Sequence, residues 1–336
     1  MEKLRVGVIG LGVGSKHIDA YQSHPSAEVV KICDINNDRL KEVTREYYRI
    51  DGVSNPDEIL DDNCIDVVSI ASYDNYHCEQ ILRALKNEKH VYVEKPMCLF
   101  DHEAKSIRDL LNSKPELQLS SNLVLRTCPR FVRLKDAILS GEMGDIYSIS
   151  ADYLWGRKYK LTKGWRKDMD YYSIVLGAGV HMIDLLNWMT NLLPVEVKAY
   201  GNQIATKNSN LKHSDFMAIL LKYDTGLIVQ VSAHGGCIHP HCHDLRVYGT
   251  KKTFINGIAG GVWINSSDPD VLPVDIAEEY PGKANRGDVI KTFINSIFNR
   301  NIKPLVSTDD IFNTMSVCFA AEKAMHTNSN VKVEYI

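Results

Sequence analysis

A short apolar run that leads directly into a glycine-rich turn constrains the fold of this chain more than any other feature. Val6–Ile9 is the apolar run, and Gly10, Gly12 and Gly14 follow it. Such a run predicts a buried strand, and the glycines allow a tight turn into a helix. A helix that begins near Gly14 presents backbone N–H groups and a positive dipole end to a phosphate. An ordinary tight βα turn is the other interpretation of the same residues.

Short apolar runs alternate with helical stretches through the first third of the chain. The expected strands are Leu4–Ile9, Glu28–Asp34, Cys64–Ala71, Lys89–Val93 and Leu117–Leu123, and the expected helices include Asn37–Tyr48, His77–Asn87 and Asp101–Asn112. Repeated βα units give parallel strands with helices on both faces of the sheet. We therefore expect an α/β domain with a doubly wound parallel sheet over residues 1–123.

The pattern changes to longer strand-like runs after residue 123. Expected strands are Asp145–Leu154, Val195–Gln203, Phe216–Tyr223, Gly226–Ala233, Asp244–Gly249 and Thr253–Asn256, and expected helices are Pro129–Leu139, Asp288–Phe298 and Asp310–His326. This order predicts an α+β domain over residues 124–336, built on a large, open, mostly antiparallel sheet. The boundary depends on the change of pattern alone, because no linker marks it.

Composition excludes several classes of protein. A net charge of -3 over 336 residues argues against a nucleic-acid binder. The chain has no apolar run long enough for a membrane span, and its start has no signal-peptide pattern. The 8 cysteines form no CxxC pair, which fits reduced thiols better than a disulfide framework. We therefore expect a cytoplasmic protein with no membrane partner.

Asp34 supports the interpretation of the glycine turn as a dinucleotide site. It ends the second expected strand, where an acidic side chain would bind the ribose hydroxyls. A carboxylate there repels a 2′-phosphate, which favours NAD over NADP; a helix N-cap is the alternative role. The expected contacts of the cofactor include the backbone of Gly10, Gly12, Val13 and Gly14. Ser15 stands where the usual motif has its third glycine, and its small side chain can still pack closely between helix and strand.

Lys95 is the most distinctive charged residue of the first domain. Glu94-Lys95-Pro96 follows the apolar run His90–Val93, so a strand ends by placing one amine at the carboxyl edge of the sheet. Ligands of open parallel sheets bind at that edge. The sequence therefore predicts that Lys95 lies beside the reactive end of the cofactor.

These motifs together resemble the Gfo/Idh/MocA oxidoreductases over nearly the whole chain. The matching segments are the glycine turn with His17, Ser72–His77 as a degraded TPNxxH, Glu94-Lys95-Pro96 as EKP, and Gly179–Asp184 as GxHxxD. The resemblance implies a Rossmann domain and hydride exchange between a nicotinamide cofactor and a hydroxyl carbon of a sugar, cyclitol or nucleotide-linked sugar. It also implies a homodimer or homotetramer, a cis bond before Pro96, and cofactor contacts by Ser72, His77, Glu94 and Lys95.

The chain departs from the family pattern in two places. Tyr73 and Asp74 replace the usual Pro-Asn, which should alter the loop near the nicotinamide. Gly177 stands where the family often carries an aspartate four residues before the histidine. One relay or substrate-binding carboxylate is therefore missing from the usual set.

Oxidation of an alcohol needs a base within hydrogen-bond reach of the hydroxyl. His181 suits this role because its pKa ordinarily lies near neutrality, and Lys95 would then stabilise the developing alkoxide. The swapped assignment stays open, because a dry pocket can lower the pKa of a lysine. Asp184 shares a helix face with His181, where it would orient the imidazole, bind a substrate hydroxyl, or only pack.

Two further clusters have more than one interpretation. The basic loop contains Arg157, Lys158, Lys160, Lys163, Trp165, Arg166 and Lys167. It would suit an anionic substrate if it faces the site; a solvated loop or subunit contact is the alternative. His234 and the segment Cys237–His243 carry zinc-type ligands, but their compact spacing does not favour a closed metal site. Substrate contact through His234 and a plain loop between strands both stay open.

The sequence thus leaves two main functions. The first is an NAD-dependent dehydrogenase or reductase with Lys95, His181 and Asp184 as catalytic residues and Arg157, Trp165, Arg166 and His234 near a sugar-like substrate. The second is a non-catalytic sensor of sugars that keeps the fold and the dinucleotide, which the loss of a carboxylate at Gly177 motivates. A metal-dependent lyase or hydrolase centred on residues 234–243 is a weaker third interpretation.

Overall fold

The computed structural model describes residues 3–336, so Met1 and Glu2, the first residues of the predicted first domain, lie outside it. Contacts divide the chain into two units. Unit 1 contains the residues up to Val124, Ala284–Phe312 and Ile336, and unit 2 contains Leu125–Lys283 and Asn313–Tyr335. This division differs from a single cut at residue 123, because a late segment of the chain returns to the first unit.

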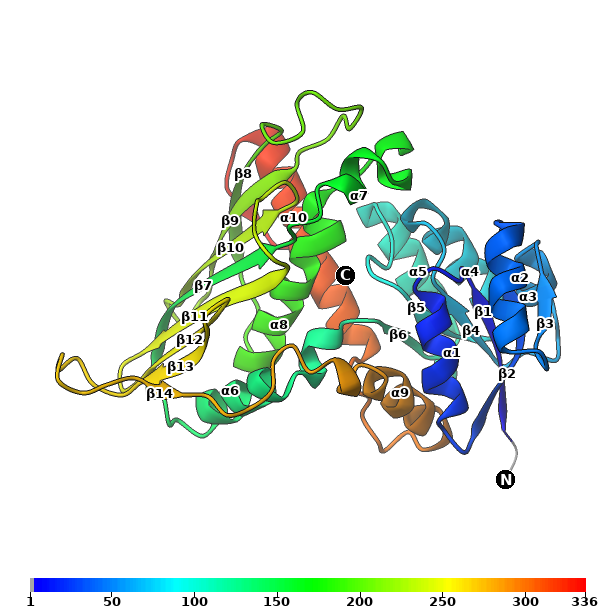
Figure 1. The fold of residues 1–336 in the computed structure, drawn as a ribbon, viewed down its shortest axis with the longest axis horizontal. Helices are drawn as coiled ribbons and strands as arrows, with labels where there is room; N and C mark the ends of the chain where they lie inside the picture. The colour runs from blue at the N-terminus through cyan, green and yellow to red at the C-terminus, as the bar shows by residue number, and fades with distance from the viewer. Residues whose placement is uncertain (1–2) are drawn as a thin grey trace. The chain divides into compact units, whose positions relative to one another are not determined.

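Unit 1 is built on a 6-stranded sheet with the order β3-β2-β1-β4-β5-β6. All of its strand pairs are parallel. The strands are β1 (Leu4–Ile9), β2 (Ala27–Cys33), β3 (Asp51–Val53), β4 (Val67–Ile70), β5 (His90–Val93) and β6 (Leu119–Ser121). The helices are α1 (Gly14–Gln22), α2 (Asn37–Glu46), α3 (Asp57–Leu60), α4 (His77–Lys86), α5 (Asp101–Ser113) and α9 (Asp288–Phe298), with a 3₁₀ turn η1 (Asp74–Tyr76). The predicted doubly wound parallel sheet is confirmed (Figure 1).

The strand order of unit 1 reverses at β1, which pairs with β2 on one side and β4 on the other. Loops that leave two neighbouring parallel strands in opposite directions open a crevice at the carboxyl ends of the strands. The glycine turn follows β1, Ser72 follows β4 and Lys95 follows β5. The residues predicted to hold a cofactor in unit 1 therefore share the edge of the sheet at which such folds bind ligands.

Helix α9 completes the core of unit 1. The ring of Phe293 lies 5.8 Å from that of Tyr92 on β5, and Gln118 donates to the Ser296 carbonyl at 2.8 Å. The Ser120 hydroxyl donates to the carbonyl of Val306 at 2.9 Å. Residues that the sequence pattern placed in the second domain therefore cover the last strand of the first sheet.

Unit 2 contains a 9-stranded sheet with the order β14-β13-β12-β11-β7-β10-β9-β8-β15. Its strands are β7 (Ile146–Leu154), β8 (Glu196–Asn202), β9 (Phe216–Lys222), β10 (Ile228–His234), β11 (Cys242–Gly249), β12 (Thr253–Gly257), β13 (Gly260–Ile264), β14 (Val274–Asp275) and β15 (Val331–Lys332). Strands β7 and β10 pair in parallel, whereas the other neighbouring strands of this sheet pair antiparallel. The mostly antiparallel sheet is confirmed.

The helical segments of unit 2 are α6 (Pro129–Leu139), α7 (Tyr159–Thr162), η3 (Trp165–Asp168), the π-helical turn η4 (Val175–Gly179) and α8 (Val180–Thr190). The turns η2 (Val124–Thr127) and η5 (Lys283–Asn285) and helix α10 (Thr308–Thr327) include residues of both units. No helix among residues 3–336 is both long enough and apolar enough to cross a bilayer.

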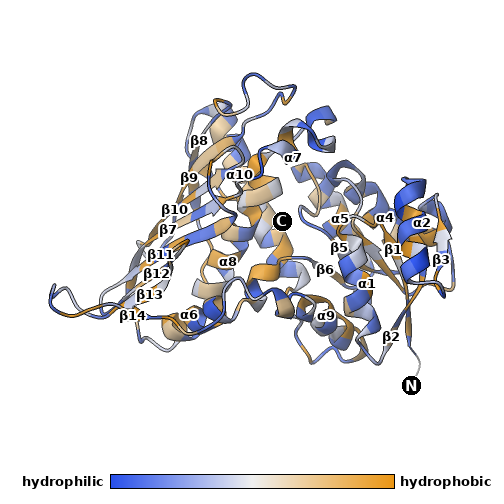
Figure 2. Cartoon of the chain, in the orientation of Figure 1, coloured by the Kyte–Doolittle hydropathy of each residue, from blue (hydrophilic) through white to orange (hydrophobic). Residues whose placement is uncertain are grey.

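The two faces of the large sheet differ in cover. Alternate residues such as Ile219 and Val231 are buried, whereas Tyr200, Leu220 and Ile228 on the opposite face are exposed, as the alternation of side chains along a strand requires. Helix α8, largely apolar in Figure 2, lies along the buried face. No helix of the described residues covers the other face in Figure 1.

Candidate functional site

The glycine turn has the backbone geometry that a phosphate site needs. Gly10 has a φ of 86°, and a Cβ atom there would lie 2.3 Å from the Ala71 carbonyl oxygen. Nothing lies within 4 Å of the Cβ position at Gly12, so a ligand can approach the backbone there. Helix α1 has no side-chain cap at its N-terminus, which leaves its first N–H groups for an anion. These features fit a dinucleotide pyrophosphate.

Gly14, rather than Ser15, fills the role of the third glycine of the motif. Its Cβ position lies 3.1 Å from Val8 and 3.2 Å from Ala71, so helix α1 packs closely on the sheet at this residue. Ser15 is only half-buried, and its hydroxyl lies 3.5 Å from the Gly12 carbonyl oxygen. The close contact between helix and sheet is therefore made by Gly14 and not by Ser15. The extra glycine at position 14 was the signal for the correct assignment.

Asp34 lies beside the turn and holds its conformation. Its carboxylate accepts hydrogen bonds from the Leu11 amide and from the Asn36 amide, both at 2.8 Å. Asn36, rather than Asp34, caps helix α2 through its side chain. The Asp34 carboxylate is half-buried, and a carboxylate can accept further hydrogen bonds. Its position is therefore compatible with the predicted contact to a ribose.

The loops after β4 and β5 are joined by His77. Its imidazole is fully buried, with Nδ1 at 2.7 Å from the Pro96 carbonyl oxygen and Nε2 at 3.1 Å from the Ser72 carbonyl oxygen. The Ser72 hydroxyl donates to Gln80 at 2.7 Å. His77 therefore holds the two loops together through their backbones, and its buried ring is a support for the loops.

Glu94 is the centre of a buried polar network next to Lys95. Its carboxylate lies 3.1 Å from His17 Nε2 and accepts a hydrogen bond from the Asn122 amide at 2.5 Å. The amide of Lys95 donates to the other Glu94 oxygen at 3.3 Å. His17 Nδ1 in turn lies 3.0 Å from the Ser69 hydroxyl. The network fixes the end of β5, where the peptide bond between Lys95 and Pro96 is cis, as expected.

The charge of Glu94 is stabilised in spite of its burial. Burial raises the pKa of this carboxyl, but the hydrogen bond and charge of His17, the charge of Lys95 and the Asn122 amide together leave the pKa below its ordinary value. A buried carboxylate with such partners remains ionised at neutral pH. The ammonium group of Lys95 is therefore attached to a strand end that carries a fixed negative charge.

His181 lies in unit 2 at the start of α8, directly after the π-helical turn η4. Such turns often occur at functional sites. The turn leaves no space for a side chain at Gly177, because a Cβ there would lie 2.5 Å from the Tyr172 hydroxyl oxygen. Tyr172, which is 3% exposed, thus occupies the space beside Gly177. The glycine at this position has a packing reason that the sequence alone did not reveal.

Asp184 is fully buried and bonded to Arg126. The Arg126 guanidinium donates to it with contacts of 2.6 Å from one terminal nitrogen and 3.0 Å from Nε, and both side chains are 2% exposed or less. The Thr314 hydroxyl lies 3.4 Å from the same carboxylate. Asp184 was predicted as a catalytic residue, but its carboxylate lies inside unit 2 and is paired there.

The ring of Tyr153 on β7 connects His181 to two histidines of the segment Cys237–His243. Tyr153 is stacked on His181 with ring centroids 5.8 Å apart. It also contacts His241 and His243 edge-on, at 5.2 Å and 5.1 Å. These aromatic side chains therefore form one cluster on the helix-covered face of the sheet.

His234 does not belong to this cluster. Its Nε2 lies 2.7 Å from the Ser232 hydroxyl, and Ser232 donates to Asp152. Because Asp152 precedes Tyr153 in a strand, the two side chains point to opposite faces. The structure thus places His234 on the face opposite to Tyr153, whereas His241 contacts the same Tyr153 ring as His181 does. Among residues 3–336, no group of three or more His, Cys, Asp and Glu side chains is arranged to hold a metal ion.

The basic loop forms the short helix α7 and the turn η3. The Arg166 guanidinium carbon lies 4.2 Å from the centre of the Trp165 ring and 5.3 Å from that of Trp155. Leu161 is fully buried and packs closely on Gly235. A Cβ atom at Gly235 would lie only 2.6 Å from the Leu161 Cδ1 atom. The loop is therefore anchored on the end of β10, with Trp165 and Arg166 stacked and Arg157 exposed.

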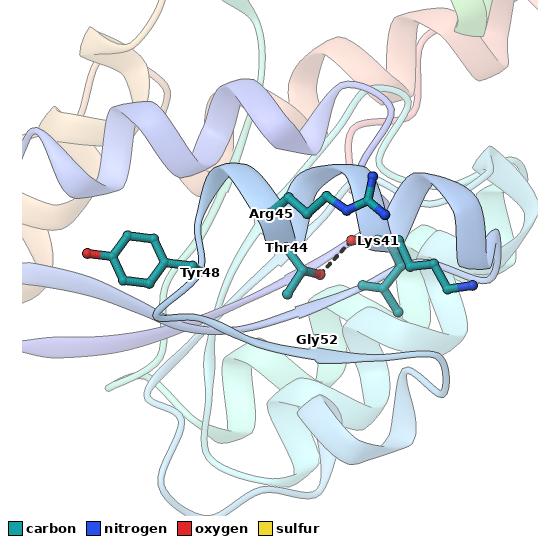
Figure 3. A pocket seen from close by; sticks show the side chains of 6 residues that line it. Lys41, Thr44, Arg45, Tyr48 and Gly52 are labelled. Atoms are coloured by element: carbon teal, nitrogen blue, oxygen red, sulfur yellow. Dashed lines mark hydrogen bonds between the residues drawn. The ribbon is translucent and has the colours of Figure 1, made fainter.

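A separate groove lies on α2 and β3 (Figure 3). Its lining includes Lys41, Thr44, Arg45, Tyr48 and Gly52. The Thr44 hydroxyl donates to the Leu40 carbonyl within the helix. None of the residues predicted for the cofactor or for catalysis lines this groove.

Two family models match the chain. Residues 4–122 match the model described as "Oxidoreductase family, NAD-binding Rossmann fold", and residues 131–255 match the model of the "GFO/IDH/MocA C-terminal domain". The chain is similar to a myo-inositol 2-dehydrogenase of Thermotoga maritima, with 22% identity over 99% of both chains. It is 27% identical to a glucose-6-phosphate 3-dehydrogenase of Bacillus subtilis, over 74% of this chain and 73% of the relative.

The fold agrees with these matches. A crystal structure of scyllo-inositol dehydrogenase from Lactobacillus casei, with bound NAD(H) and scyllo-inositol, superimposes with a TM-score of 0.80 at 20% identity over 99% of each chain. The glycine turn and Glu94-Lys95-Pro96 fall inside the first matched region, and His181 falls inside the second. The chain belongs to the Gfo/Idh/MocA family of oxidoreductases and carries its NAD-binding Rossmann domain.

Proposed function

We propose that this protein is an NAD-dependent dehydrogenase or reductase that acts on a hydroxyl carbon of a sugar, a cyclitol or a nucleotide-linked sugar. The observation that carries the proposal is the buried network of Glu94, His17 and Asn122, which fixes Lys95 at the carboxyl edge of the parallel sheet. A network of this kind is costly to bury. Its position beside the only amine of the motif supports a chemical role for Lys95.

The cofactor would be held by unit 1. The N-terminus of α1 and the backbone of Gly10, Gly12, Val13 and Gly14 would bind its pyrophosphate. Asp34 would accept a hydrogen bond from a ribose hydroxyl while it continues to bind the Leu11 amide. Bound NAD supplies hydride acceptance at its nicotinamide ring. The names of the relatives, which include inositol and glucose-6-phosphate dehydrogenases, support this class of substrate.

The acid–base step would use His181 and Lys95 on one hydroxyl group. In the oxidation direction, the imidazole of His181 would take the hydroxyl proton, while NAD+, when bound, would supply the hydride acceptor. The Lys95 ammonium stabilises the negative charge that develops on the oxygen. Asp184 would then be a positioning residue that holds α8 through Arg126, since its buried carboxylate is already paired.

A non-catalytic sensor of sugars is the second candidate. Gly177, which replaces an expected carboxylate, and the altered pair Tyr73-Asp74 favour it. The buried environment of Gly177 weakens this argument, because Tyr172 fills the space beside it. A side chain at position 177 would need the space that the Tyr172 ring occupies.

Turnover decides between the two candidates. We would incubate the protein with NAD+ or NADH and a panel of polyols, sugar acids, sugar phosphates and nucleotide sugars, and follow the absorbance of reduced nicotinamide. Lys95→Met should lower kcat by about 100-fold or more and leave the Kd of NADH nearly unchanged. Binding of NADH without turnover of any substrate would favour the sensor.

Assembly and location complete the proposal. We propose a homodimer or homotetramer that pairs the uncovered face of the large sheet, where Tyr200, Leu220 and Ile228 are exposed, because apolar residues gathered on a sheet face mark contact surfaces. Leu220→Glu should lower the mass measured by light scattering. We also propose a cytoplasmic location, which the 8 free cysteines support.

A further inference from the structure

We propose that the substrate carries a negatively charged group, a carboxylate or a phosphate, which binds Arg166 with Arg157 and Lys160 beside it. This inference rests on the proposed function and specifies the chemistry of its substrate. It assigns a binding task in the reaction to these three cations of the basic loop, in place of a solvated surface.

The first argument is a concentration of positive charge without acidic partners. Among residues 3–336, Arg157, Lys160 and Arg166 have no carboxylate within ion-pair distance, whereas Lys167 in the same loop pairs with Asp168. Burial, then the charges of Arg157 and Arg166, lower the pKa of Lys160, so these groups repel one another. Such an arrangement is unfavourable in the empty protein and becomes favourable when an anion enters.

The second argument is the ordered position of Arg166. Its guanidinium group lies over the rings of Trp165 and Trp155, contacts that hold an arginine side chain in one orientation. Its Nε is buried and has no hydrogen-bond partner among the described residues. The residue as a whole is only half-buried, so the rest of its guanidinium group can donate charge-assisted hydrogen bonds to an oxyanion. A merely solvated arginine would not need this environment.

The third argument connects the loop to the proposed base within unit 2. Trp155 follows β7 directly, and its amide donates to the His234 carbonyl at 3.1 Å, which continues the pairing with β10. Alternation along the strand puts Trp155 on the same face as Tyr153, about 7 Å further along. Tyr153 stacks on His181. Arg166 and His181 are therefore linked within unit 2 through the side chains of Trp155 and Tyr153, so one extended substrate could contact both.

Matched substrates test the inference. We would compare kcat/KM for glucose, glucuronate and glucose 6-phosphate with NAD+, so that the two anions distinguish a carboxylate from a phosphate. The wild type should prefer one anion over glucose by about tenfold or more. Arg166→Gln should remove most of that preference, so that the ratio of the kcat/KM for the anion to that for glucose falls toward one.

Control variants separate charge from folding. Lys167→Gln should leave every value unchanged, because Lys167 already pairs with Asp168 in the same loop. Arg166→Lys should recover only part of the preference, since lysine lacks the planar group and the Nε donor. Equal use of glucose and both anions by the wild type would overturn the inference, as would an Arg166→Gln variant that loses all three substrates alike.

A binding measurement keeps the two proposals distinguishable. If no sugar reduces NAD+, the proposed function fails, and calorimetry of inorganic phosphate and of glucuronate against the NADH complex then tests the charged site alone. NADH is included so that its pyrophosphate blocks the glycine turn. Binding in the wild type that is lost in Arg166→Gln would support the site. Binding of neither anion would refute it.

Discussion

The surroundings of Lys95 and of His181 are stabilised in different ways. Next to Lys95, the buried Glu94 is held by several hydrogen-bonding groups, among them the imidazole of His17 and the neutral side-chain amide of Asn122. Near His181, the buried Asp184 is held by Arg126, whose charge is permanent. The first network therefore depends on several hydrogen bonds around one carboxylate, whereas the second is an ion pair with a permanently charged guanidinium group that supports helix α8.

The largest expected effect on stability comes from breaking the buried ion pair between Arg126 and Asp184. Asp184→Ala leaves the Arg126 charge buried without its partner, and the free energy of unfolding should fall by about 3–5 kcal/mol. Chemical denaturation with urea measures this. Replacement of both partners by apolar residues, Arg126→Met with Asp184→Leu, should recover most of the loss. A double variant as unstable as the single one would show that the pair does more than neutralise charge.

A smaller loss of stability is expected at the π-helical turn before His181. Gly177→Ala should cost about 1–3 kcal/mol, because its Cβ would lie 2.5 Å from the Tyr172 hydroxyl oxygen. Tyr172→Phe in the same chain should recover part of this, since it removes the closest atom. An alanine variant with the melting temperature of the wild type would mean that the turn can widen freely.

At the Lys95 network, activity should respond more than folding. Glu94→Gln keeps the shape of the side chain but removes the charge, so kcat should fall about tenfold while the free energy of unfolding falls by about 1–2 kcal/mol. Steady-state kinetics and urea denaturation measure the two effects. Asn122→Asp is the complementary variant, because it adds a negative charge beside Glu94 where Glu94→Gln removes one. It should lower kcat as well. A fall in stability without a fall in kcat would assign Glu94 to packing alone.

The smallest effect concerns pH. Although burial raises the pKa of Glu94, its partners leave the folded-state value below the ordinary value of 4.5, so its ionised form stabilises the fold. That contribution is fully present above about pH 4.5 and is lost as the pH falls through the folded-state pKa. The difference in unfolding free energy between wild type and Glu94→Gln should therefore be constant above about pH 5 and shrink in more acidic solution. A difference that grows on acidification would contradict the assigned sign.

Local patterns predicted the parts of the site that depend on neighbouring residues in the chain. The glycine turn, the strand before Lys95 and the helix that carries His181 each combine a short apolar period with distinctive residue types. In the structure, helix α1 packs on the sheet at Gly14 and not at Ser15. The extra glycine of this chain therefore shifts the helix–sheet contact by one position. That correction was available from the motif itself.

Contacts between distant segments could not be predicted in this way. Arg126 lies 58 positions before Asp184, and nothing near either residue indicates the other. His234 lies with Asp152 on one face of the sheet, whereas His241 contacts Tyr153 on the other face. This difference depends on strand register, which places alternate residues on opposite faces. Tyr153 had no motif of its own, so its contact with His181 needed the coordinates. The return of residues 284–312 to unit 1 likewise has no local signal.

That return has a consequence for the synthesis of the protein on the ribosome. The Tyr92 ring packs against Phe293, and the last strand of the parallel sheet is bonded to residues near Val306. A nascent chain that has emerged only as far as residue 124 therefore lacks the cover for one side of its sheet. We infer that the nucleotide domain matures late in translation, and that a fragment cut at the apparent domain boundary would be a poor reagent for cofactor titrations.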